Sequence, residues 1–178
     1  DTITYLAEGD WAIITRTSLE IRDMTGAIVE RPVKKIEIGS ASVDKGGYKH
    51  LMAKEIAEQP TVLQGALANY INADATAITL PDPGLDFTGV QRITMVACGT
   101  ASYACHVARY WFEQLARLPA EVDVASEFRY RDPIIDEKTV VMAISQSGET
   151  ADTLAAMNEG KQRGATLWSI VNVIGSQA

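Results

Sequence analysis

The stretch VVMAISQSGETADT, residues 140–153, contains the clearest structural signal in the sequence. A nearly continuous apolar run over residues 139–144 is typical of a β-strand buried on both faces of a parallel sheet. The run stops at several hydroxyl-bearing residues around one glycine, and a helical pattern follows over residues 150–163, with Gly164 as a stop. The stretch therefore predicts a buried strand, a polar turn and a helix in succession.

The same alternation of strand and helix extends to both sides of this stretch. Residues 93–97 form a short apolar run, and residues 103–118 have their apolar positions on one helical face. Residues 121–125 and 167–173 have the pattern of strands. Strands that alternate with helices favour right-handed crossovers and a parallel sheet. The predicted fold class is α/β, with a doubly wound, three-layer parallel sheet of the flavodoxin-like kind.

The first forty residues have a different, β-rich pattern. Residues 11–15 and 19–22 are strand-like, residues 23–26 contain a turn signal, and residues 27–30 follow as the predicted hairpin partner. Pro32 then favours an edge position or a break in the strand. We expect an antiparallel β segment that is too short to form a stable core by itself.

A linker and two helical segments are predicted between these regions. Residues 39–47 are rich in glycine and serine, which is typical of a linker. Apolar residues at helical spacing begin at Leu51, and this helix is expected to stop at Pro60. A second helical stripe covers residues 62–71, and residues 80–85 are expected to form a loop.

The composition argues against several classes of protein. The chain has 178 residues, 47% of them hydrophobic and 22% charged, which suits one or two globular domains. A net charge of −7 argues against nucleic acid or an anionic membrane as the partner. The sequence contains neither an apolar run of membrane-spanning length nor a recognisable signal peptide, so a cytoplasmic location is expected. Cys98 and Cys105 are expected to be reduced thiols that pack as small buried hydrophobic residues.

Two hydroxyl-rich turns contain the predicted chemistry. The first turn (residues 97–102, ACGTAS) and the second turn (residues 145–150, SQSGET) each follow a predicted strand and lead into a helix. Ligands of open parallel sheets bind beyond the carboxyl ends of the strands. A helix N-terminus offers unpaired N–H groups and the positive end of the helix dipole. Together with short hydroxyl donors and a glycine, these groups predict a phosphate cradle that needs no metal.

Ordinary helix capping is the alternative interpretation of these turns, because Ser and Thr are favoured N-caps. Two such turns, each after a parallel strand, favour anion binding. Glu149 would repel a phosphate, so its side chain is expected to turn away from the ligand. Ser145 and Ser147 lack the context of a nucleophile elbow, and no nucleotide-binding glycine motif is present. His50 and His106 are expected at the surface or its boundary, and we expect no metal and no cofactor.

Seven segments together resemble the family of glutamine–fructose-6-phosphate aminotransferases (isomerising): YLAEGDWAIIT, DMTGAIVER, KGGYKHLMAKEIAEQP, ACGTASYACHVARYWFE, EVDVASEFRYRDP, SQSGETADTLAA and IVNVIGS. The resemblance implies that residues 1–38 are the C-terminal strands of a glutamine amidotransferase domain. Residues 39–47 would be the linker, and residues 48–178 the first sugar isomerase (SIS) domain, incomplete at its C-terminus. The family makes glucosamine 6-phosphate and glutamate from fructose 6-phosphate and glutamine. This chain would be a segment of a homodimeric enzyme, inactive alone, that binds the sugar phosphate.

The same resemblance implies a binding role for the two turns and no catalytic residue or metal ligand within this chain. Many family members have Ser after Cys-Gly-Thr, whereas this chain has Ala101, whose N–H can still donate, and Ser102 one place later. Residues 126–131 have no assigned role and are expected to form a polar loop. Two alternatives are a non-catalytic regulator that binds sugar phosphates and a docking module whose turns only cap helices. The implied substrate-binding residues are Cys98, Gly99, Thr100, Ala101, Ser145, Gln146, Ser147 and Thr150.

Overall fold

The computed structural model describes residues 2–35, 44–79 and 86–178 of the chain. The chain divides into two compact units, Asp1–Pro81 and Asp82–Ala178. The predicted loop over residues 80–85 and residues 39–43 of the predicted linker lie outside the described residues.

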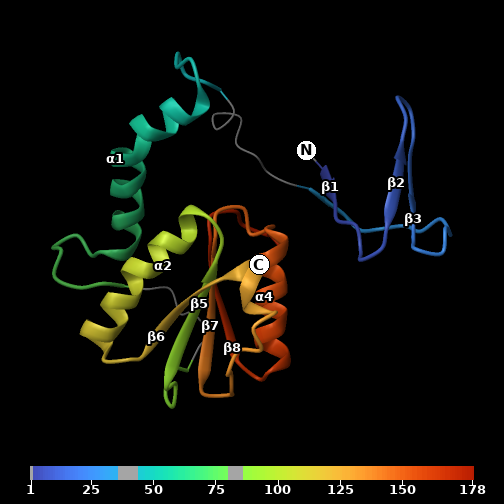
Figure 1. Ribbon diagram of the computed structural model, residues 1–178. Coiled ribbons are helices and arrows are strands. Elements are labelled where there is room, and N and C mark those ends of the chain that lie inside the picture. Colours follow the sequence, from blue (N-terminus) through green and yellow to red (C-terminus); the bar gives the residue numbers. More distant parts are fainter. Residues whose placement is uncertain (1, 36–43, 80–85) are drawn as a thin grey trace. The chain divides into compact units, whose positions relative to one another are not determined.

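A four-stranded parallel sheet forms the centre of the second unit (Figure 1). Its strands are β5 (Arg92–Ala97), β6 (Ala120–Val124), β7 (Thr139–Ser145) and β8 (Thr166–Val171). Their order across the sheet is β6-β5-β7-β8, and every neighbouring pair is parallel. This is the order of flavodoxin-like sheets. The predicted doubly wound α/β class is therefore confirmed.

Helices cover both faces of this sheet. α2 (Thr100–Trp111), which continues into a π-helical turn (Phe112–Ala116), follows β5, and α4 (Ala151–Gln162) follows β7. Figure 1 shows α2 and α4 on opposite sides of the strands. α2 begins at Thr100 rather than at the predicted Tyr103. The positive φ of Gly99, 57°, lets the chain turn into the helix directly after the strand.

Two apolar cores result from the alternation of side chains along the strands. On one face, Met95 of β5 packs in the same core as Cys105 of α2. On the other face, Val96 and Val141 pack in the same core as Ala156 of α4. All five side chains are at most 1% exposed. Full burial of a large apolar side chain contributes about 1.5–3 kcal/mol relative to exposure. The continuous apolar runs of β5 and β7 follow from burial on both faces.

The segment after β6 begins with a short helix, so the predicted polar loop is wrong for residues 126–128, whereas residues 129–131 form an exposed turn. α3 (Ala125–Phe128) packs against α4, and the Phe128 side chain is fully buried in the core on that face of the sheet. Arg131 then forms an ion pair with Asp123 on β6. A single buried aromatic residue among charged neighbours creates no hydrophobic period, so the sequence pattern did not reveal this helix.

Two antiparallel strand pairs make up the N-terminal β segment. β1 (Thr2–Thr4) pairs with β4 (Val33–Lys35), and β2 (Trp11–Ile14) pairs with β3 (Leu19–Arg22). The prediction of an antiparallel β segment is confirmed, although β1 and β4 had not been expected.

The predicted pairing of residues 27–30 with β3 is confirmed only as a short antiparallel contact. β3 pairs along its length with β2. Residues 27–29 contact its end through one antiparallel bridge, between Arg22 and Ile28, and through the N–H groups of Asp23 and Val29, which donate to the carbonyls of Ala27 and Ile21 at 3.0 and 2.9 Å. The turn between β2 and β3 closes through the N–H of Thr15, which donates to the carbonyl of Ser18 at 2.9 Å. This turn contains neither glycine nor asparagine, the usual hairpin signals, and the Thr15 hydroxyl contacts the Ser18 hydroxyl at 2.6 Å instead.

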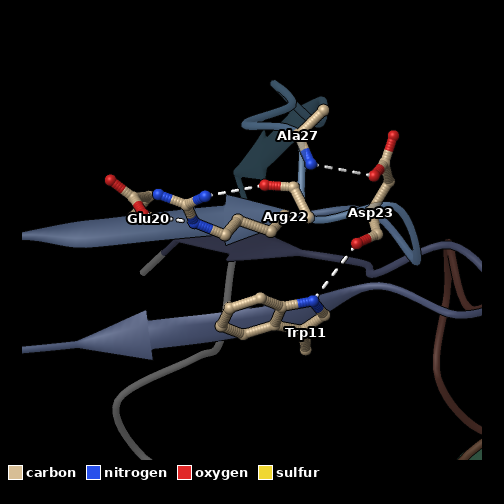
Figure 2. A network of polar contacts seen from close by, with 6 residues as sticks. Trp11, Glu20, Arg22, Asp23 and Ala27 are labelled. Atoms are coloured by element: carbon tan, nitrogen blue, oxygen red, sulfur yellow. Dashed lines mark hydrogen bonds and ion pairs between the residues drawn. The ribbon is translucent and has the colours of Figure 1, made fainter.

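Polar contacts fix the predicted turn that follows β3 (Figure 2). The Nη1 of Arg22 donates to the carbonyl of Gly26 at 2.6 Å. The indole N–H of Trp11 donates to the carbonyl of Asp23 at 3.1 Å. Because Trp11 belongs to β2, the second contact ties the turn to the neighbouring strand.

A single helix, α1 (Leu51–Tyr70), replaces the two predicted helical segments. Pro60 lies inside this helix, so the predicted stop there is wrong. A proline ring removes one backbone hydrogen bond and favours a kink. Good helix formers such as Glu, Gln, Leu and Ala on both sides favour continuation of the helix. Among the residues described, no helix combines the length and the apolar character that crossing a membrane requires.

The close packing of α4 on β7 generates a stability prediction for Gly160→Ala. A Cβ at Gly160 would lie 2.9 Å from Cγ2 of Val141, whereas a Cβ at Gly65 in α1 would meet no atom within 4 Å. Both alanines gain about 1 kcal/mol of helix propensity, so the difference between the two variants isolates the clash. We expect Gly160→Ala to have a free energy of unfolding about 1–3 kcal/mol below that of Gly65→Ala. Denaturant unfolding measures this difference, and equal values would contradict the tight contact.

Candidate functional site

The candidate site lies at the carboxyl ends of two neighbouring strands whose following helices cover opposite faces of the sheet. β5 and β7 are adjacent and parallel, but the helices that follow them, α2 and α4, cover opposite faces (Figure 1). An arrangement of this kind opens a crevice beyond the carboxyl ends of the two strands. The first turn and the second turn both lie at this crevice.

The two turns line one cavity of about 250 Å³. Ligand pockets commonly have volumes of about 300–1,000 Å³, so this cavity has room for a small anionic group and part of the molecule that carries it. None of its lining residues has a formal charge, and Gly99 is the one predicted site residue that does not line it. The lining residues are Cys98, Thr100, Ala101, Ile144, Ser145, Gln146, Ser147, Thr150 and Thr153.

In the first turn, Thr100 is the hydroxyl donor that the structure places at the cavity. Ser102 is buried, and its hydroxyl donates to the carbonyl of Gly99 at 2.7 Å. Ser102 therefore does not replace the hydroxyl that Ala101 lacks. Ala101 still lines the cavity, and as a first-turn residue of α2 its N–H has no partner within the helix.

In the second turn, both serine hydroxyls accept backbone hydrogen bonds. Ser145 Oγ accepts the N–H of Gly148 at 3.0 Å, and Ser147 Oγ accepts the N–H of Glu149 at 3.1 Å. A hydroxyl has one hydrogen to donate as well as two lone pairs. Each serine oxygen that accepts an N–H can therefore still direct its own hydrogen toward a ligand in the cavity.

Neither helix at the site has a side-chain cap. The N-cap residues, Gly99 for α2 and Thr150 for α4, form no side-chain capping hydrogen bond. The first intrahelical bond of α4 runs from the N–H of Leu154 to the carbonyl of Thr150, at 3.0 Å. The preceding N–H groups have no partner within the helix. The capping interpretation thus does not account for the Thr150 hydroxyl, which lines the cavity.

Sequence reasoning missed Thr153 and Ile144 as lining residues. Thr153 is 1% exposed and lies one helical turn after Thr150, on the same face of α4. That three-residue spacing is a signal that the sequence contains. Ile144 precedes the second turn at the end of β7, and its position at the cavity depends on the neighbouring strand.

The two cysteines have different surroundings, and both are free thiols. Cys105 is buried as predicted, and burial raises the pKa of its thiol to about 11. Cys98 is only half-buried: it packs against the core on the α4 face, which the prediction expected, but it also lines the cavity. Its position directly after β5 places it at the edge of that core, beside the crevice.

Neither histidine lines the cavity. His50 and His106 are both exposed, as predicted. Within the described ranges, no three His, Cys, Asp or Glu side chains gather as a potential metal site.

A sequence profile of the SIS domain matches residues 86–178, the range that contains all four strands of the parallel sheet and both turns. The chain belongs to the SIS domain family. The cavity therefore lies within its SIS domain, at the switch point of the sheet.

Relatives of known name match almost the whole chain. A protein of Bradyrhizobium diazoefficiens is 52% identical over 174 residues, and one of Zymomonas mobilis is 47% identical over 171 residues. Both are named glutamine–fructose-6-phosphate aminotransferase (isomerizing), which confirms the resemblance seen in the sequence. The matches cover 97% and 96% of this chain but only 29% and 28% of the two relatives. This chain thus spans less than a third of their length.

A solved structure agrees with this assignment. The C-terminal domain of glucosamine-fructose-6-phosphate aminotransferase from Francisella tularensis matches with a TM-score of 0.68 and 38% sequence identity. The match covers 75% of this chain and 38% of that one. It confirms the sugar isomerase fold of the SIS domain.

The two cysteines are expected to differ in their reactivity toward iodoacetamide at pH 8. With a pKa of about 11, the Cys105 thiol is almost entirely protonated at this pH, with roughly one thiolate in a thousand. Its reaction should accelerate only as the pH approaches 11, or on unfolding, whereas the half-buried Cys98 reacts in the folded protein. Peptide mass spectrometry over time measures both rates. Faster labelling of Cys105 than of Cys98 at pH 8 would contradict the described burial.

Proposed function

We propose that this chain is a segment of a glutamine–fructose-6-phosphate aminotransferase and that the two turns of its SIS domain hold the phosphate of the sugar. The observation that carries this proposal is the convergence of both turns on one cavity at the switch point. The names of relatives about 50% identical over nearly the whole chain support the choice of fructose 6-phosphate or glucosamine 6-phosphate as the ligand.

The chemistry of the cavity suits a phosphate held by neutral donors. The hydroxyls of Thr100, Ser145, Ser147 and Thr150 are short donors on two sides of the cavity. The unpaired N–H groups and the positive dipole end of α4 add to them. Asp152, in the first turn of α4, forms an ion pair with Arg129 at 4.0 Å rather than lining the cavity.

The proposed role of this segment is positioning. Among the lining residues none has a carboxylate, an imidazole or an amine. Acid–base catalysis on the sugar carbons therefore requires groups from elsewhere in the intact protein. A fixed phosphate holds the reacting carbons in place relative to such groups, because remote contacts supply orientation.

The same proposal extends to the domain organisation. We assign residues 1–38 to the end of a glutamine amidotransferase domain, residues 39–47 to a linker, and residues 48–178 to the first SIS domain. The intact protein is proposed to be a cytoplasmic homodimer that uses no cofactor.

Substitution of the cavity hydroxyls tests the proposed phosphate site. In the intact protein, we expect Ser147→Ala and Thr150→Ala each to weaken fructose 6-phosphate binding by about 10- to 100-fold, because each removes a hydrogen bond to a charged group. Isothermal titration calorimetry measures the affinities. Ser102→Ala is the matched control, since the Ser102 hydroxyl donates to a backbone carbonyl instead of facing the cavity.

Product analysis distinguishes the three hypotheses on the function of the protein. Formation of glucosamine 6-phosphate from glutamine and fructose 6-phosphate by the intact protein would support the aminotransferase. Binding without conversion would indicate a sugar-phosphate-binding regulator. Absence of binding to the wild-type protein would refute the proposal and favour a docking module.

A further inference from the structure

Residues 172–178, which we call the strap, lie against the second turn. The N–H of Asn172 donates to the carbonyl of Gln146 at 3.3 Å, and the N–H of Ala178 donates to the carbonyl of Gly148 at 3.1 Å. Two carbonyl groups of the turn are thus held on the side of the strap. A carbonyl oxygen facing the cavity would repel an anion, so these contacts matter for anything negatively charged that binds there.

Glu149 binds the strap through both of its carboxylate oxygens. Oε1 accepts the backbone N–H of Gln177 at 2.8 Å, and Oε2 accepts the side-chain amide of Gln177 at 2.7 Å. Hydrogen bonds to an ionised acceptor are roughly twice as strong as neutral ones. The carboxylate is therefore directed at the strap, and Glu149 does not line the cavity. This agrees with the expectation that the side chain turns away from the ligand.

Gly148 allows the strap to approach this closely. Its φ is +67°, and a Cβ at this position would lie 2.1 Å from Oγ of Ser176 and 2.6 Å from its Cβ. No side chain fits in that space, and the left-handed backbone conformation itself disfavours one. The glycine of the second turn thus serves the contact with the strap.

The contact with the strap has a consequence on the cavity side of the turn. In a trans peptide, the carbonyl and the following N–H point in opposite directions. With the Gly148 carbonyl bound to the strap, the N–H of Glu149 points away from it, and Ser147 Oγ accepts this N–H at 3.1 Å. One lone pair of the Ser147 oxygen is thereby used, and its hydrogen remains to be donated into the cavity.

We propose that Glu149 is a positioning residue for the phosphate: it holds the strap through Gln177 and so keeps the second turn in its anion-binding conformation. This inference rests on the proposed function, which places the phosphate in the cavity. The proposed effect of Glu149 on phosphate affinity is opposite to the effect of its charge alone, because a carboxylate near a bound phosphate weakens binding by repulsion.

Two substitutions at Glu149 separate the contact from the charge. Glu149→Ala removes both, and we expect about 10-fold weaker binding of fructose 6-phosphate to the intact protein. Glu149→Gln removes the charge but keeps both contacts if the Gln177 amide turns over, since an amide offers a donor and an acceptor. This conservative variant is expected to retain most of the wild-type affinity, unlike Glu149→Ala. Titration calorimetry gives the affinities, with Glu137→Ala, at an exposed position before β7, as the control for net charge.

A second pair of variants tests the contact from the side of the strap. Gln177→Glu places two carboxylates against each other and is expected to weaken binding about 10-fold. The double variant Glu149→Gln/Gln177→Glu again sets a donor against an acceptor and is expected to recover most of this loss. Such recovery in a double-mutant cycle reports the pair itself. Thermal midpoints, measured in parallel, show whether each variant remains folded.

The possible outcomes distinguish the inference from the function on which it rests. Tighter binding by both Glu149 variants would show that the residue acts only by its charge, and unchanged binding would show that the strap does not influence the turn. A double variant no better than Gln177→Glu would also overturn the inference. If the wild-type protein binds neither fructose 6-phosphate nor inorganic phosphate, the proposed function fails, and the positioning role fails with it.

Discussion

The parallel pairing of β5 with β7 is the constraint on which the site depends. Because the two strands are neighbours while α2 and α4 cover opposite faces, their carboxyl ends must lead the chain apart. The crevice between the diverging turns is a consequence of topology rather than of any one side chain. The residues of the two turns decide what the crevice can bind, and here they supply side-chain hydroxyl and backbone N–H donors without a formal charge.

A site built from neutral donors binds an anion well only if its backbone is held in one conformation. A lysine or arginine attracts an anion from many positions, whereas a hydroxyl must point at it. In the second turn, the oxygens of Ser145 and Ser147 are occupied by backbone N–H groups, which fixes the serines before any ligand arrives. The strap adds the same kind of order from outside the cavity. Donors that are oriented in advance cost less conformational entropy on binding.

The remainder of the second unit supports this order. β5 and β7 are buried on both faces. Phe128 fills the core beside α4, and the missing side chain of Gly160 permits the close approach of α4 to Val141. Turns that begin at the ends of such strands start from a fixed position. Rigid elements of this kind therefore hold the binding groups of a site in a defined geometry. The chain matches less than a third of its curated relatives, and these named relatives are aminotransferases. In the proposed function, this segment contributes the two phosphate-binding turns, and groups elsewhere in the intact protein complete the chemistry.

The sequence by itself determined the alternation of strands and helices, the parallel sheet and the two turns, because these depend on local hydrophobic period and on residue types next to one another. It also identified the residues of the two turns that line the cavity. Only the tertiary structure decided that Ser102 faces Gly99, that Thr153 joins the cavity, that α3 buries Phe128 and that Glu149 binds the strap. Each of these depends on side-chain direction or on partners distant along the chain, and no local pattern encodes either.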